Sequence, residues 1–186
     1  MNPRLFTFVG GSYGPWKIVR FETVVGAPLA RPERLNIVNG SIARPPEGTA
    51  WVLRGVTSNE RYVNKDEKAK LAATQAALGR PECTRAALIP IRKNTQWWAL
   101  TQEERRQVFE ESSHHIKAGL KHLPAVARRL HHCRDLEETG PFDFLTLFDY
   151  AEADTSAFED LVEELRATEE WKYVDREIDV RLVREG

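Results

Sequence analysis

The fold is decided by residues 101–133, which read TQEERRQVFEESSHHIKAGLKHLPAVARRLHHC. Thr101 and Glu104 have the spacing of a capping box, in which each side chain satisfies a free backbone N–H at the start of a helix. Apolar residues then recur at helical spacing until a proline ends the pattern, and a segment of alternating character follows it. The stretch predicts one helix over 101–121 and a strand over 126–133.

Two adjacent histidines lie within the predicted helix. At 3.6 residues per turn, His115 falls at the edge of the apolar arc, in line with Val108 and Gly119, whereas His114 points away from it. A neutral imidazole that faces a pocket can bind iron. From the residues alone, an ordinary core or surface histidine is the commoner case, so both interpretations stay open.

The predicted strand carries a cation among aliphatic side chains. Its period-2 alternation places Val126, Arg128, Leu130 and His132 on one face. A guanidinium in such a row favours a bound anion, because buried charges in proteins are paired. The triplet His131, His132 and Cys133 resembles a metal cluster, but neighbours on a strand point to opposite faces and cannot converge on one zinc ion.

Length and charge limit the classes of protein. The chain has 186 residues, 41% of them hydrophobic, which is enough for one sizeable core or for two small lobes that share one. Lys plus Arg (27) nearly balance Asp plus Glu (28), so there is no basic field for nucleic acid or an anionic membrane. The run LFTFVG is broken by Gly10, Gly11 and Gly14 before it reaches the length of a signal peptide or a membrane span. We therefore expect a soluble cytoplasmic protein that starts near Met1.

Other reactive side chains indicate no site. Cys83 and Cys133 are too few for a disulfide framework, and the CxxCH motif for covalent haem is missing, so we expect two free thiols. Ser112 and Ser113 beside His114 do not predict a nucleophilic triad, because no turn exposes a serine and no oxyanion donors are evident.

Several strands, two helices and a connector are predicted outside this stretch. The first half should contain strands over 5–9, 16–25 and 51–57, a connector with at most a short helix over 26–49, and a helix over 59–78 capped by Gly79. The second half should contain strand 86–92, helix 101–121, strands 126–133 and 142–150, helix 155–168 and strand 173–183.

The order of the second half, βαββαβ, is typical of a ferredoxin-like lobe. The first half repeats strands followed by a helix in shortened form. We therefore expect an α+β protein of two ferredoxin-like lobes, a shortened one over 1–84 and a second over 85–186, with a pocket between sheet and helix.

Five separated motifs carry a family resemblance. They are RGVTSNERYVN, IPIRKNTQWW, EESSHHIKAGLKHLPAVARRL, FDFLTLFDY and ATEEWKYVDREIDVRLVRE. Together, from about residue 51 to the end, they resemble the chlorite dismutase family, in particular its short, dimeric lineage. The resemblance implies a dimeric α+β barrel of two such lobes, with one non-covalent haem b per subunit in the C-terminal lobe.

The resemblance also implies roles for individual residues. His115 matches the proximal iron ligand, Arg128 the distal arginine, and Glu170 the carboxylate that accepts the proximal imidazole N–H, with Glu169 as the alternative if the register slips by one. The positions that match donors and a cation near the haem propionates are Tyr62, Lys93 and Trp97. The positions that match the wall of the distal cavity are Leu130, Thr146 and Phe148.

The implied reaction is the conversion of chlorite to chloride and dioxygen, with formation of the O–O bond. Arg128 would attract the anion and retain a hypochlorite-like fragment. Two alternatives share the fold: a coproheme decarboxylase-like protein, against which Arg128 is the sequence feature, and a peroxidase-like haem protein.

A homodimer is expected from the lineage and from the last predicted strand. Its apolar residues Val174, Ile178, Val180 and Leu182 alternate with polar ones and offer an apolar face to a second copy. The other interpretation is that this face belongs wholly to the core of the subunit.

Overall fold

The computed structural model describes residues 4–57 and 77–185. Its strands are β1 (Leu5–Gly11), β2 (Trp16–Val25), β3 (Arg34–Asn39), β4 (Thr49–Thr57), β5 (Arg85–Lys93), β6 (Val126–His132), β7 (Phe144–Tyr150) and β8 (Val174–Arg184). Its helices are α2 (Thr95–Ala99), α3 (Gln102–Arg106), the π-helical turn η1 (Gln107–Ser112), α4 (His115–Lys121), the 3₁₀ turn η2 (Glu152–Asp154), α5 (Thr155–Arg166) and the 3₁₀ turn η3 (Glu170–Tyr173).

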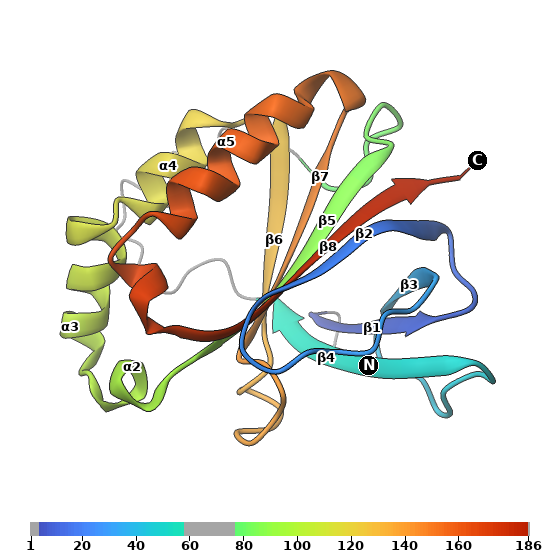
Figure 1. Ribbon diagram of the computed structural model, residues 1–186, viewed down its shortest axis with the longest axis horizontal. Helices are drawn as coiled ribbons and strands as arrows, with labels where there is room; N and C mark the ends of the chain where they lie inside the picture. The colour runs from blue at the N-terminus through green and yellow to red at the C-terminus, as the bar shows by residue number, and fades with distance from the viewer. Residues whose placement is uncertain (1–3, 58–76, 186) are drawn as a thin grey trace.

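The strands form one closed antiparallel barrel in the order β1-β3-β2-β8-β5-β7-β6-β4. The strands of each half of the chain are contiguous in it: β4-β1-β3-β2 from the first half and β8-β5-β7-β6 from the second. The two halves join where β2 pairs with β8 and where β4 pairs with β6. Figure 1 shows α3, α4 and α5 on one side of the barrel, alongside the strands of the second half.

Two apolar clusters lie on opposite faces of the sheet. The cluster inside the barrel takes side chains from strands all around it, among them Phe8, Leu35, Leu88, Leu145, Ile178 and Val180. The outer cluster packs the second half of the sheet against α4 and α5 and includes Ile89, Ala118, Val126, Phe148, Phe158 and Leu161. Period-2 alternation explains the division, because neighbouring residues of a strand face opposite sides.

Most predicted strands are confirmed with small shifts at their ends. The connector predicted over 26–49 was wrong, because it contains β3 (Arg34–Asn39). Prolines and glycines flank that short strand and hide it in the sequence, whereas its pairing with β1 supplies the backbone hydrogen bonds that define it. The helix predicted over 59–78 falls largely outside the described residues; Gly79 has the positive φ (86°) that suits a glycine.

The single helix predicted over 101–121 was also wrong. The capping box is confirmed, since Thr101 N–H donates to Glu104 and Glu104 N–H donates to the Thr101 hydroxyl. Beyond it the chain forms α3, the π turn η1 and then α4, with His114 in the left-handed region (φ 50°) between the last two. The break removes the alignment of His115 with Val108, but Gly119 still follows His115 by one turn within α4.

The apolar face predicted for dimer formation belongs to the subunit itself. Ile178, Val180 and Leu182 lie in the interior cluster, and Val174 lies in the outer one. That part of the argument for a dimer was therefore wrong.

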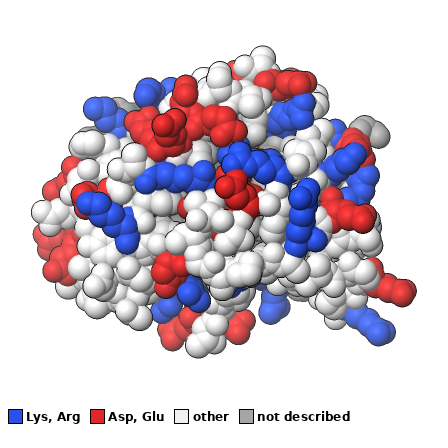
Figure 2. All heavy atoms as spheres, viewed as in Figure 1, with Lys and Arg blue, Asp and Glu red and all other residues white. Residues whose placement is uncertain are grey.

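The surface carries both signs of charge. Figure 2 shows basic and acidic side chains interspersed over the face in view, without a continuous basic field. None of the helices within residues 4–57 and 77–185 combines the length and the hydropathy that crossing a bilayer requires.

Candidate functional site

The candidate site lies on the outer face of the second half, between β6 and α4. Arg128 pairs in the sheet with Phe148, and Leu130 pairs with Thr146 on the same two strands. The structure therefore brings these four predicted residues together. Phe148 is buried, whereas Arg128, Leu130 and Thr146 remain partly exposed although helices cover this side of the barrel. These three side chains are therefore not fully covered by the helices on this side.

The guanidinium of Arg128 reaches from β6 to α4. A Cβ atom built on Gly119 would lie 2.6 Å from the carbon and both terminal nitrogens of that guanidinium. Gly119 thus leaves bare helix backbone facing the sheet, one turn after His115. Burial lowers the pKa of Arg128, and the nearby carboxylates of Glu170 and Glu110 oppose that effect. The site thus holds a partly exposed cation between sheet and helix, with two carboxylates nearby.

A buried ion pair lies next to this cation. The Lys93 ammonium donates to a carboxylate oxygen of Glu170 at 2.8 Å and to the Glu170 carbonyl oxygen at 3.2 Å. Only 3% of Lys93 and 4% of Glu170 are exposed. Burial lowers the pKa of Lys93, although the Glu170 carboxylate raises it. The alternative residue, Glu169, is exposed and pairs with Lys172 at the surface.

Glu170 is tied to the segment that carries His115. The Ser113 hydroxyl accepts a hydrogen bond of 2.9 Å from the Glu170 backbone N–H. His115 begins α4, and its side chain lies outside what the structure describes. His114 is exposed and precedes the helix. Tyr62 also lies outside the described residues.

Trp97 supplies a hydrogen-bond donor that the described protein atoms leave unused. It is almost fully buried, at 1% exposed, and its indole Nε1 has no hydrogen-bond partner within residues 4–57 and 77–185. The Lys93 ammonium lies 4.4 Å from the centre of its ring, and Tyr173 packs edge-on against it. An orphaned N–H of this kind suits a ligand oxygen, because buried polar groups otherwise find partners.

The histidine and cysteine triplet does not form a metal site. His131 points into the barrel between Phe6 and Phe8, whereas His132 lies edge-on to Phe144 on the outer face. The described part of the chain holds no group of three or more candidate metal ligands. Both cysteines are free, and burial raises the pKa of Cys133 to about 12. The prediction of opposite faces is confirmed.

Glu110 and Asp143 are site neighbours that the sequence did not reveal. Glu110 accepts a hydrogen bond from the backbone N–H of Ile116. Asp143 accepts from the Lys93 backbone N–H at 2.7 Å and from the Trp98 indole at 3.2 Å. The contact of Glu110 depends on a turn, and the contacts of Asp143 depend on residues far apart in the sequence. The periodicity of helices and strands predicts neither kind of contact.

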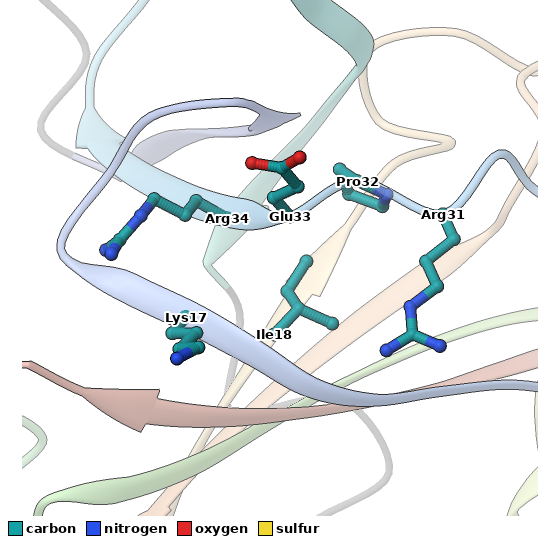
Figure 3. A pocket seen from close by; sticks show the side chains of 6 residues that line it. All are labelled: Lys17, Ile18, Arg31, Pro32, Glu33 and Arg34. Carbon is teal, nitrogen blue, oxygen red and sulfur yellow. The ribbon is translucent and has the colours of Figure 1, made fainter.

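A separate hollow lies in the first half of the chain, where β2 and β3 diverge. It has a volume of about 390 Å³ and is lined by Lys17, Ile18, Arg31, Pro32, Glu33 and Arg34. Figure 3 shows Lys17 and Arg31 on either side of Ile18, so their charges do not converge on one point. Lys17 and Arg34 pair with Glu185 instead. None of the predicted site residues lies in this hollow.

Known proteins share the sequence pattern and the fold of this chain. The model of the family described as chlorite dismutase matches residues 44–185. The chain belongs to the chlorite dismutase family. A chlorite dismutase of Ideonella dechloratans is 34% identical over 123 residues, which make up 65% of this chain and 40% of that protein. The chain thus matches less than half the length of that curated relative.

Solved chlorite dismutases have the same fold. A dimeric chlorite dismutase from Nitrobacter winogradskyi superposes with a TM-score of 0.87 at 53% identity, over 97% of this chain and 99% of that chain. A mutant chlorite dismutase from Candidatus Nitrospira defluvii gives 0.71 at 18% identity, over 98% of this chain and 91% of that chain. At that identity the likeness shows the fold alone.

The residues present fit the haem that the chlorite dismutase family uses. Gly119 lets the Arg128 guanidinium approach the backbone of α4, and a Cβ atom there would lie 2.6 Å from it. Trp97 offers a buried N–H, which no described residue accepts, for a carboxylate such as a propionate. Glu170 provides a buried carboxylate close to the segment of His115, where an iron-bound imidazole needs an acceptor for its second N–H.

Proposed function

We propose that this chain is a haem b enzyme that converts chlorite to chloride and dioxygen, with one non-covalent haem per subunit. The observation that carries the proposal is the position of Arg128, a cation on a partly exposed sheet face directly opposite the bare backbone of Gly119. The 53% identity to a dimeric chlorite dismutase over nearly the whole chain supports it.

The residues divide between the two sides of the proposed haem. His115 would hold the iron, and Glu170 would accept its imidazole N–H, which makes the ligand a stronger donor. Lys93 was predicted to lie near the propionates, but its ammonium donates to Glu170, so its proposed role is instead to keep that carboxylate ionised and oriented. Trp97 would donate to a propionate, and Tyr62 is a second proposed donor.

On the opposite side, Arg128 would attract chlorite and retain the fragment left when one Cl–O bond breaks. The haem, when bound, supplies the iron at which chlorite binds and reacts. Leu130, Thr146 and Phe148 form the proposed wall around the anion and limit the entry of water. Chlorite becomes chloride and dioxygen without gain or loss of a proton, so the reaction needs no acid–base pair on this side.

We also propose that the chain consists of two ferredoxin-like lobes and that it forms a homodimer. Both halves of the chain have the strand order fourth-first-third-second, β4-β1-β3-β2 and β8-β5-β7-β6, which supports two ferredoxin-like lobes divided after residue 84. The homodimer is proposed because the similar Nitrobacter winogradskyi protein is dimeric. Light scattering that gave the mass of a monomer or a pentamer would contradict it.

The test is oxygen release from chlorite by the haem-loaded chain, followed with an oxygen electrode. We expect the parent and His114→Ala to bind haem and release oxygen, and His115→Ala to lose both. His114→Ala is the matched control, because it removes the adjacent imidazole from an exposed position. Haem loss in His114→Ala with retention in His115→Ala would refute the ligand assignment, and a haem-loaded parent that released no oxygen would refute the function.

A further inference from the structure

The backbone on both sides of His115 is hydrogen-bonded to Glu110, a residue of the preceding π turn. The π turn η1 ends at Ser112, and Ser113 and His114 then lead into α4 without a side-chain cap from His114. The carbonyl oxygen of Glu110, within η1, accepts hydrogen bonds from the backbone N–H of Ser113 and of His114. Glu110 therefore fixes the chain on the N-terminal side of His115.

The Glu110 side chain fixes the other side. One of its carboxylate oxygens accepts a hydrogen bond of 2.7 Å from the backbone N–H of Ile116. That N–H is one of the free donors at the start of α4, where a negative charge is favoured by the helix dipole. A hydrogen bond to an ionised carboxylate is shorter and stronger than one between neutral groups. One residue thus holds the backbone immediately before and immediately after His115.

The π turn gives this arrangement a reason. A regular helix through Glu110 and Ile116 would direct the two residues to different faces, because six residues span well over one turn. The wider turn and the left-handed conformation of His114 let the Glu110 carboxylate reach forward to the start of α4. π turns inside helices frequently occur at functional sites. Glu110 also lies close enough to Arg128 for its charge to act on that guanidinium.

We propose that Glu110 is a positioning residue for the iron ligand. By holding the Ile116 N–H with its carboxylate, next to His115, it would fix the backbone that carries the iron ligand, and so the strength of the bond to iron. The inference rests on the proposed function, because it needs His115 to bind haem. The competing explanation is an ordinary helix cap, which would stabilise the fold and leave the iron unaffected.

The test uses the full-length chain titrated with haem b, in the parent, Glu110→Ala, Glu110→Gln and Glu111→Ala. Glu111 is the matched control, since it is an exposed carboxylate in the same turn. We expect Glu110→Ala to weaken haem binding by roughly ten- to a hundredfold, as loss of a residue that orients a metal ligand does. Its ferrous iron–histidine stretching band should also broaden and shift in the resonance Raman spectrum.

Glu110→Gln should give a haem affinity and a Raman band between those of the parent and Glu110→Ala, because an amide oxygen can still accept from the Ile116 N–H. The glutamine variant also allows the test to be made if Glu110→Ala folds poorly. If both variants change only the unfolding temperature, and keep the haem affinity and Raman band of Glu111→Ala, Glu110 is a cap and the inference is wrong. Retention of haem by His115→Ala would instead refute the proposed function, so the two failures are distinguishable.

Discussion

Leu145 and Thr146 are neighbours in β7, yet they lie in two different settings. Leu145 is completely buried in the interior of the barrel, where apolar side chains from both halves meet. Thr146 faces outward beside Leu130 and remains partly exposed. The interior is closely packed with apolar side chains, whereas the outer face of the second half carries charges and partly exposed side chains.

The outer face itself contains two kinds of buried charge. Near α5, Glu177 and Asp179 accept hydrogen bonds from Arg166, and Arg181 binds both Asp179 and Glu159. These ion pairs fasten α5 to β8. Near α4, by contrast, the charges lie beside a bare helix backbone and partly exposed side chains. The comparison shows that a buried charge does not by itself mark a functional site, because the charges near α5 serve to hold the fold together.

The largest expected effect is the loss of stability when a side chain of the barrel interior is shortened, compared with one on the outer face. Leu145→Ala should destabilise the fold by about 2–5 kcal/mol, because it opens a cavity in a packed core. Leu130→Ala, on the partly exposed outer face, should cost less than half as much and should alter haem binding more. Denaturant unfolding and haem titration of the two variants measure both quantities, and equal losses of stability would contradict the division.

The next effect tests the outer face directly. Arg128→Ala should keep haem and lower oxygen production per haem by roughly one to two decades, since a hydrogen bond to a charged group is worth about 1.5–3 kcal/mol. Bleaching of the haem should accelerate, and methionine, which traps hypochlorite, should protect the variant more than the parent. Arg128→Lys should fall between them, because it keeps the charge without the planar fork.

Turnover per bound haem and thermal unfolding, measured together, decide the role of Arg128. If Arg128 only pairs with carboxylates, the alanine variant will lose stability while its folded fraction turns over normally. That result would remove the catalytic role.

The last effect belongs to the interior and depends on pH. Burial lowers the pKa of His131 to about 4, and its Nδ1 donates to the Leu145 carbonyl oxygen. In the unfolded chain a histidine titrates near 6.5, so its contribution to stability is complete above about pH 6.5. Stability should fall by at most about 1.4 kcal/mol per pH unit between there and pH 4.

His131→Asn can keep the donor to Leu145 and removes the titrating ring, so it should flatten the dependence of unfolding free energy on pH between 6.5 and 4. Haem affinity at neutral pH should not change, because His131 faces the interior of the barrel. An unchanged slope in the variant would show that another group titrates.

Local chemistry made some features predictable and not others. The capping box at Thr101 and the alternation of β6 depend on neighbours in sequence, and both are confirmed. The break between α3 and α4 was not predictable, because it depends on Ser113 meeting Glu170 and on the forward reach of Glu110. The strand β3 is defined by its pairing with β1 across a turn-rich segment.

In the candidate site, too, only the features that depend on neighbours in sequence could be predicted. The sequence placed Arg128 among Val126 and Leu130, since strand period alone determines that row. Burial of Glu170 beside Lys93 joins residues 77 positions apart. No periodicity encodes such a distance, so the family resemblance named the two residues separately and only the structure shows that they pair.

The position of β8 in the barrel has a consequence for synthesis. β8 is translated after all the other described strands, yet it lies between β2 and β5 and pairs with both. Until it emerges from the ribosome, those two strands present open edges, which are prone to pair with other chains. The barrel therefore closes only after translation of this strand, and the nascent chain needs protection from aggregation until then.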